Sequence, residues 1–292
     1  MLYILLTVTT SVFLLVVFKL FVKYKVNTFV AIIVNYFVAA ITGAVALNVN
    51  INVNQFYLNK WLLLCIPLGV LFIIVFYLIS ITAQKISVST ASMANKLSFV
   101  MPVLFSVFIL NDTFNVFKIC SVFLAITAIY LATKSVNNNN KQFKLNFLPL
   151  LVFIGSGLID VFINWINASY IKDDNHKALF TIGTFFTAFC IGIVIILFHA
   201  FKNWNETKEN TFKLNNLIGG VALGLPNFFS IYFTFKSLSD SEFTSAQLFP
   251  ILNLSNVVLA TICGYFFFTE KLSKANFIGI LLAITSIFLI LI

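Results

Sequence analysis

Long apolar segments recur along the chain, and a short polar stretch separates each from the next. Ten of them approach or exceed the roughly 20 residues that a helix needs to cross the hydrocarbon core of a bilayer. They lie at about residues 2–22, 28–47, 61–83, 88–110, 116–134, 147–170, 178–200, 217–237, 243–268 and 275–292. The pattern predicts an all-α integral membrane protein with ten transmembrane helices.

The composition agrees with this assignment. Hydrophobic residues make up 61% of the 292 residues and charged residues only 9%, whereas soluble domains have about 25% charged residues. The formal net charge is +9, but the lysines are scattered singly over short connections, as is typical of the flanks of membrane helices. We therefore expect the protein to lie in the lipid bilayer and to have no nucleic-acid partner. The four cysteines lie in different apolar segments without metal-ligand spacing, so we expect neither a metal nor another cofactor.

The chain contains an internal repeat. Asp112 precedes the tetrapeptide Leu124–Thr127 by the same interval at which Glu270 precedes an identical tetrapeptide, Leu282–Thr285. One shared tetrapeptide is unremarkable among leucine-rich helices. An acid and a tetrapeptide in a shared register are harder to obtain by chance, and they favour a duplicated unit.

A polar linker at residues 135–146 separates the two copies, which are residues 1–134 and 147–292. Each copy has five apolar segments. Because five is an odd number, the second copy must enter the membrane from the opposite side. The sequence thus predicts two inverted five-helix repeats.

Two segments carry polar residues and a proline at membrane depth. In residues 88–110, Asn95 and Lys96 lie about a turn before the middle, and Pro102 lies just past it. A lysine there costs at least about 2.5 kcal/mol on insertion scales, and a proline frees a backbone carbonyl that lipid cannot satisfy. The second such segment, residues 243–268, carries Gln247, Pro250, Asn253 and Asn256. We interpret both as proline-broken helices that form the walls of one central pathway.

In both halves, small and polar residues precede the proline of a fourth helix, and an acidic residue and a fifth helix follow. The residues concerned are Ser89, Thr90, Ala91, Pro102 and Asp112 in the first half, and Thr244, Ser245, Ala246, Pro250, Glu270 and Gly279 in the second. This arrangement resembles the drug/metabolite transporter superfamily, EamA type, over essentially the whole chain. The departures from that pattern flank the acids: Asn111 and Thr269 replace Gly, Asp112 replaces Glu, and Thr113 and Lys271 replace Arg. The resemblance implies a ten-helix carrier that moves a small metabolite by alternating access.

Two ionisable residues lie clearly within apolar segments, Lys96 and Asp160. Ser156, Asp160 and Asn164 are spaced by four residues and therefore share one helical face. Two interpretations stay open: this face lines a substrate or proton site, or Asp160 and Lys96 form a structural pair that holds helices together. Opposite signs also allow a pair that holds the empty carrier and opens when a charged substrate binds.

Polar residues at helical spacing also mark the fourth and ninth segments. Any single one is equally well explained by a hydrogen bond between helices, which contributes about 0.6–2 kcal/mol. Several that converge from three helices favour a site. The candidate substrate-binding residues are Ser92, Asn95, Lys96, Phe99, Ser156, Asp160, Asn164, Gln247, Asn253 and Asn256. Weaker candidates are Asn35, Tyr36 and Asn227.

The common enzyme and nucleotide-binding motifs are absent from the sequence. We predict a carrier, not an enzyme, for a small-molecule substrate in the cytoplasmic membrane, coupled to protons or another ion and working as a monomer or homodimer. The alternative is a membrane-embedded transferase or other lipid-active enzyme. Its divalent-ion site would be the acidic cluster of Asp173, Asp174 and His176, but a solvated turn explains that cluster more simply.

The orientation in the membrane stays open. The lysine distribution places both termini outside, whereas the resemblance implies that both are inside.

Overall fold

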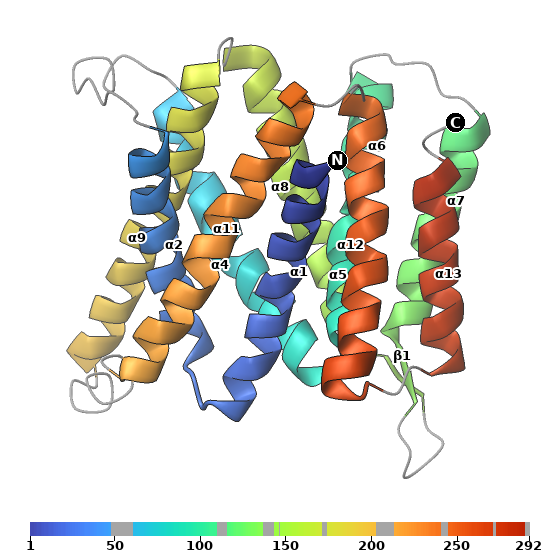
Figure 1. Ribbon diagram of the computed structural model, residues 1–292, viewed down its shortest axis with the longest axis horizontal. Helices are drawn as coiled ribbons and strands as arrows, with labels where there is room; N and C mark the ends of the chain where they lie inside the picture. The colour runs from blue at the N-terminus through green and yellow to red at the C-terminus, as the bar shows by residue number, and fades with distance from the viewer. Residues whose placement is uncertain are drawn as a thin grey trace. The chain divides into compact units, whose positions relative to one another are not determined.

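All ten predicted apolar segments are helical (Figure 1). The computed structural model describes residues 1–47, 61–109, 116–136, 143–145, 147–170, 174–202, 213–240, 245–270 and 273–289. In chain order the elements are α1 (Leu2–Lys23), α2 (Thr28–Ala46), α4 (Trp61–Lys85), α5 (Val88–Lys96), η1 (Leu97–Phe99), α6 (Val100–Ile109), α7 (Val116–Thr133), β1 (Lys134–Val136), β2 (Phe143–Leu145), α8 (Leu148–Tyr170), α9 (Asp174–Lys202), α11 (Leu214–Asp240), α12 (Ser245–Phe268) and α13 (Lys274–Leu289). The helical class predicted from the sequence is therefore confirmed.

Among the described helices, seven are long and apolar enough to cross a membrane: α1, α2, α4, α8, α9, α11 and α12. Large apolar side chains such as Phe123, Phe198 and Phe266 are exposed on helix surfaces, which suits contact with lipid tails and not with water. The chain is thus a multi-pass membrane protein. The helices α7 and α13 are apolar but shorter, and the fourth segment is divided into α5, η1 and α6.

The division of the fourth segment follows from its proline. Three residues, Leu97–Phe99, adopt the tighter 3-10 geometry between α5 and α6. The ring of Pro102 is incompatible with a regular helical position for the carbonyl of Ser98, four residues earlier. The α-helix therefore stops at Lys96 and resumes at Val100, as the sequence predicted.

The same expectation for the ninth segment is wrong. The helix α12 runs without interruption from Ser245 to Phe268, and Pro250 lies inside it. Proline is also accommodated inside α4 at Pro67 and inside α11 at Pro226. A single proline removes one backbone hydrogen bond, and the bonds on either side continue the helix.

A two-stranded antiparallel ribbon follows α7, in the stretch where the sequence predicted only a polar linker. Strand β1 pairs with β2, and Val136 lies opposite Phe143. β-Branched and aromatic residues favour strands, and in the sequence these two flank an asparagine-rich stretch of the kind that favours turns. The ribbon is the one departure from an all-helical fold in the described part of the chain.

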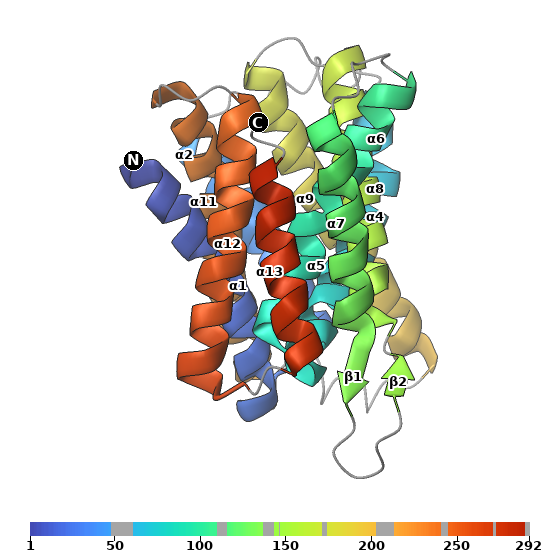
Figure 2. The ribbon, with the colours of Figure 1, turned by 90° about the vertical axis from the view of Figure 1, so that its right-hand side faces the viewer.

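The chain forms two compact units, and neither corresponds to one sequence half. Unit 1 comprises Met1–Lys19, Leu78–Val161 and Ser230–Ile292, and unit 2 comprises Leu20–Tyr77 and Phe162–Phe229. In unit 1, α5 packs against α12, and α13 packs against both α12 and α7. Figures 1 and 2 both show α7 and α13 side by side, and Figure 2 shows that they run in opposite directions.

Small residues line the contact between α7 and α13. On α7 the buried positions include Ser121, Ala125 and Ala128; on α13 they include Gly279, Ala283 and Ser286. The Oγ atoms of Ser121 and Ser286 each donate a hydrogen bond of 2.7 Å to the backbone carbonyl of the other residue. Small side chains let two membrane helices approach closely, and the serines add hydrogen bonds between them.

Unit 2 is built around Tyr36. Its ring is fully buried beside Phe72, Phe76 and Phe185, and its hydroxyl donates to the carbonyl of Phe72 at 2.8 Å. Here α2 packs against α9. The phenol is satisfied within the unit's own core, which favours a structural role for this weaker candidate.

The contact between α2 and α11 involves the two other weaker candidates. Asn227 Nδ2 donates to Asn35 Oδ1 at 3.1 Å, and both residues are buried. A side-chain carbon at Gly224 would lie 2.9 Å from the carbonyl oxygen of Asn35, so glycine allows α11 to lie close to α2 here. Asn35 and Asn227 therefore join helices within unit 2.

Candidate functional site

Residues of the candidate site meet in unit 1, on α5, η1, α8 and α12. At the buried side of α5, Ser92 Oγ donates to the backbone carbonyl of Asn256 at 3.2 Å. The side chain of Asn256 donates to Leu252 O in its own helix at 2.7 Å. Both Ser92 and Asn256 are almost fully buried, so they fasten α5 to α12.

Asp160 is held at the break in the fourth segment. Its Oδ2 atom accepts a hydrogen bond of 2.8 Å from Ser98 Oγ, and that hydroxyl lies 2.6 Å from the carbonyl of Asn95. A hydroxyl has one proton, so Ser98 can donate to only one of these acceptors at a time. Ser98 lies in η1 and was not among the predicted site residues.

A glycine brings α8 close to this break. A side-chain carbon at Gly157 would collide with Met101 and would lie 3.3 Å from the carbonyl oxygen of Ser98. Gly157 lies three residues before Asp160 on α8, so the close approach also brings Asp160 within reach of Ser98. The sequence signals were this glycine and Pro102, but neither identifies its partner.

Lys96 and Asp160 lie close enough for their charges to interact. Both side chains are described and partly exposed, and their N and O atoms do not form an ion pair within 4.0 Å. The structure therefore brings the two charges into one neighbourhood without a direct contact. Each retains capacity for a further partner of opposite charge.

Ser156 lies one turn before Asp160 on α8. Its Oγ atom is buried and has no hydrogen-bond partner among the described residues. Leaving a buried hydroxyl unpaired costs about 1–3 kcal/mol, and such an atom is a natural contact for a bound polar molecule. Ser156 and Asp160 share a helical face and both belong to unit 1, whereas Asn164, the third residue predicted for that face, belongs to unit 2.

The remaining candidates are placed as follows. Phe99 and Asn253 are partly exposed in unit 1. Asn164 is exposed and belongs to unit 2. The side chain of Gln247 lies outside the described part of the structure.

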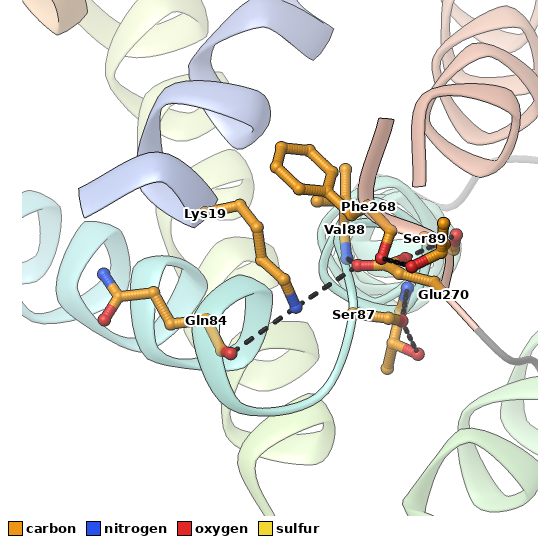
Figure 3. A network of polar contacts seen from close by, with 9 residues as sticks. Lys19, Gln84, Ser87, Val88, Ser89, Phe268 and Glu270 are labelled. Atoms are coloured by element: carbon orange, nitrogen blue, oxygen red, sulfur yellow. Dashed lines mark hydrogen bonds and ion pairs between the residues drawn. The ribbon is translucent and has the colours of Figure 1, made fainter. Parts of the chain in front are cut away.

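A second polar cluster surrounds Glu270, just beyond the end of α12 (Figure 3). Its Oε1 atom accepts from the backbone N–H of Val88 at 2.8 Å and lies 3.3 Å from Lys19 Nζ. Its Oε2 atom accepts from Ser89 Oγ at 3.4 Å. Lys19 Nζ also donates to the carbonyl of Gln84 at 3.4 Å. Glu270 marks both the internal repeat and the family resemblance in the sequence, but neither Glu270 nor Lys19 was among the predicted site residues.

The local geometry explains how Glu270 reaches the start of α5. Thr269 adopts a left-handed conformation with φ of 49°, which turns the chain back at the end of α12. The backbone N–H of Glu270 then donates to Gly264 O at 3.1 Å. A side-chain carbon at Gly264 would meet the Glu270 carboxylate and lie 2.9 Å from Ser89 Oγ. Glycine thus leaves room for the carboxylate at the positive end of the α5 dipole.

The first-half counterpart of Glu270, Asp112, lies outside the described residues. So do Asp173 and the side chain of Asp174 from the acidic cluster. The third member of that cluster, His176, lies in unit 2 with its ring centroid 6.3 Å from that of Trp61. Among the described residues, no three His, Cys, Asp or Glu side chains are placed to hold a metal ion.

Comparison with known proteins adds two findings. The model of the EamA-like transporter family matches residues 1–134 and 150–292, which is nearly the whole chain. An uncharacterized protein of Haemophilus influenzae is 28% identical over 228 residues, covering 76% of this chain and 73% of the relative's length.

Proposed function

The chain belongs to the EamA-like transporter family, and we propose that it is a secondary carrier that moves a small polar metabolite across the cytoplasmic membrane by alternating access. The observation that carries the proposal is the pair of opposite charges, Lys96 and Asp160, which lie in unit 1 without a direct ion-pair contact. Ionisable groups within membrane spans are costly and usually functional. Two charges that are left apart can each pair with a group on a bound molecule.

The proposed roles follow from the chemistry of each side chain. Lys96 attracts an anionic group of the substrate, whereas Asp160 attracts a cationic group or a coupling proton. Ser98 keeps the Asp160 carboxylate in place through its 2.8 Å hydrogen bond. Ser156 Oγ supplies an unused hydrogen-bonding atom, and the partly exposed Asn253 supplies an amide.

The packing of helices supports the inverted repeat. In unit 1 the fifth segment (α7) packs against the tenth (α13), and the fourth (α5) against the ninth (α12); in unit 2 the second (α2) packs against the seventh (α9). Each of these pairs joins helices at the same position in the two halves. The opposite directions of α7 and α13 (Figure 2) are what an inverted pair requires. We propose residues 1–134 and 147–292 as the two five-helix repeats, giving ten spans.

The enzyme alternative has less support. The polar residues that meet in unit 1 lie inside predicted membrane segments, on α5, η1, α8 and α12. The family consists of transporters. A lipid-active enzyme would instead require a reactive cluster near a membrane interface.

Reconstitution into proteoliposomes tests the carrier proposal. Uptake and efflux are measured for a panel of amino acids, organic acids, sugars and nucleosides, with and without an imposed proton gradient. We expect flux of at least one compound above that of empty liposomes, with loss of that flux in the Lys96→Ala variant. Dependence on the gradient would identify protons as the coupling ion. A folded protein that moves none of these compounds in either direction would contradict the proposal.

A further inference from the structure

The ion pair between Lys19 and Glu270 joins parts of the chain that are far apart in sequence, all within unit 1 (Figure 3). Lys19 lies near the end of α1 and also reaches the carbonyl of Gln84 near the end of α4. Glu270 follows α12 and bonds to the first N–H of α5, that of Val88. The contact thus joins the ends of α1, α4 and α12 to the start of α5.

This contact lies at one end of the helix that carries candidate site residues. Lys96 is eight residues beyond Val88 on α5, which corresponds to about 12 Å along an α-helix. The Lys19–Glu270 pair therefore lies at the end of α5 that is farther from Lys96. A molecule that enters or leaves the site past the start of α5 passes beside the Lys19–Glu270 pair.

The contacts on the two sides of Glu270 differ in length and in the packing that accompanies them. On one side, the short 2.8 Å bond from Val88 N–H, the Ser92–Asn256 bond and the close packing of α5 on α12 make α5, α12 and Glu270 one block. On the other side, Lys19 is held by two longer contacts of 3.3 and 3.4 Å. The Lys19 side chain is 20% exposed, so water can replace its partners. In the described part of the chain, α1 has no comparably close packing with α5 or α12.

We propose that the Lys19–Glu270 pair is a latch that keeps this end of the carrier closed, and that it opens once in each transport cycle as α1 separates from the α5–α12 block. The inference rests on the proposed carrier function. Glu270 stays with α5 and positions its start, whereas Lys19 is the partner that leaves. The latch assigns gating roles to two residues outside the substrate site.

Site accessibility tests the latch without requiring a known substrate. The four native cysteines are replaced by serine or alanine, and Asn95→Cys is introduced as a reporter on α5. The protein is reconstituted, and the reporter is labelled with a membrane-impermeant maleimide from each side separately. A second cysteine at Lys85, at the end of α4 next to the latch, identifies which side is the latch side.

In the Lys19→Met variant we expect labelling from the latch side to be about tenfold faster, because loss of one charge-assisted contact shifts the population of closed molecules. Labelling from the opposite side should stay constant or fall. Lys19→Arg retains the charge and should label at the parental rate. Lys23→Met removes an exposed lysine one turn away on the same helix and should also leave the rate unchanged.

Two outcomes would overturn the latch. Unchanged labelling in Lys19→Met would mean that the pair does not control access. Faster labelling from both sides would mean that the pair merely stabilises the fold. Neither outcome depends on finding a transported compound, so the latch can fail while the carrier proposal stands. Conversely, one-sided labelling in a protein that transports nothing would contradict the carrier proposal. The pair would then control access to the site without serving a transport cycle.

Discussion

Ser98 Oγ lies 2.8 Å from Asp160 Oδ2, where the fourth segment leaves α-helical geometry. This bond ties the carboxylate of α8 to the break that Pro102 imposes, so the position of one candidate charge depends on the irregular backbone that follows the other. In Ser98→Ala, Asp160 loses its donor, which should lower stability by about 1–3 kcal/mol and reduce transport. Thermal unfolding in detergent and flux in proteoliposomes measure the two effects.

A matched control for Ser98→Ala is Thr127→Ala. Within the described part of the chain, the hydroxyl of Thr127 donates to the carbonyl of Leu124 in its own helix and to no other residue, so its loss should change neither quantity. If Ser98→Ala behaves like Thr127→Ala, the hydrogen bond does not position Asp160.

The charges themselves are tested by a double-mutant cycle on Lys96 and Asp160. Lys96→Ala and Asp160→Asn should each impair transport while the protein still inserts. If the residues only stabilise each other, each single change leaves one partly buried charge unpaired at a cost of at most about 3–5 kcal/mol, and the double variant should recover both stability and transport. We expect the double variant to fold and to stay inactive. Transport at the wild-type rate would remove both residues from the site.

Sequence patterns were sufficient for the helices and for the break beside Lys96, because both depend on local properties. Apolar length determines where a chain can span a bilayer, and proline acts on the residues just before it. The predicted break at Pro250 was wrong because a proline only lowers the local stability of a helix. Packing against other helices, which is not a local property, decides whether the helix continues. The ribbon of β1 and β2 was missed because each strand is only three residues long.

The polar contacts could not be predicted because their partners are distant in sequence. Glu270 accepts the first N–H of a helix that begins 182 residues earlier, and the left-handed conformation of Thr269 turns the chain just before it. Ser98 can reach Asp160 because Gly157 has no side chain, which lets α8 lie close to the backbone of η1. These contacts depend on how closely helices that are distant in sequence pack together. A single sequence has no motif for that packing.

Gly157 provides a steric test of that approach. In Gly157→Ala the added methyl group would collide with Met101, so we expect a loss of about 1–3 kcal/mol in the free energy of unfolding. Gly183→Ala is the matched control, because its methyl group would lie 3.7 Å from Cys65 Sγ, an ordinary contact. That variant should be neutral or slightly stabilised. Equal effects at the two glycines would show that Gly157 does not lie against Met101.

The contact between α7 and α13 provides a test by cross-linking. The Oγ atoms of Ser121 and Ser286 are 3.3 Å apart, a spacing close enough for a disulfide between cysteines at these positions. In a background without native cysteines, Ser121→Cys with Ser286→Cys should cross-link on mild oxidation. Ser121→Cys with Thr285→Cys should not, because Thr285 is exposed and bonds within its own helix. Mobility on a denaturing gel after proteolysis between the helices distinguishes the two. Cross-linking of the control pair instead would place α13 in a different rotation.

The last prediction separates the two functions of Glu270. Glu270→Gln keeps an oxygen acceptor for the N–H of Val88 but removes the charge that attracts Lys19, whereas Glu270→Ala removes both. Because loss of a cap at a helix N-terminus costs about 0.5–2 kcal/mol, the alanine variant should unfold at a lower temperature than the glutamine variant. Glu270→Gln should instead match Lys19→Met in faster one-sided labelling of the site, with little loss of stability. In the double variant Lys19→Met with Glu270→Gln, the pair is already absent, so labelling should be no faster than in either single variant. An additive increase in the double variant would show that the two residues act separately, and that Lys19 and Glu270 do not work as one latch.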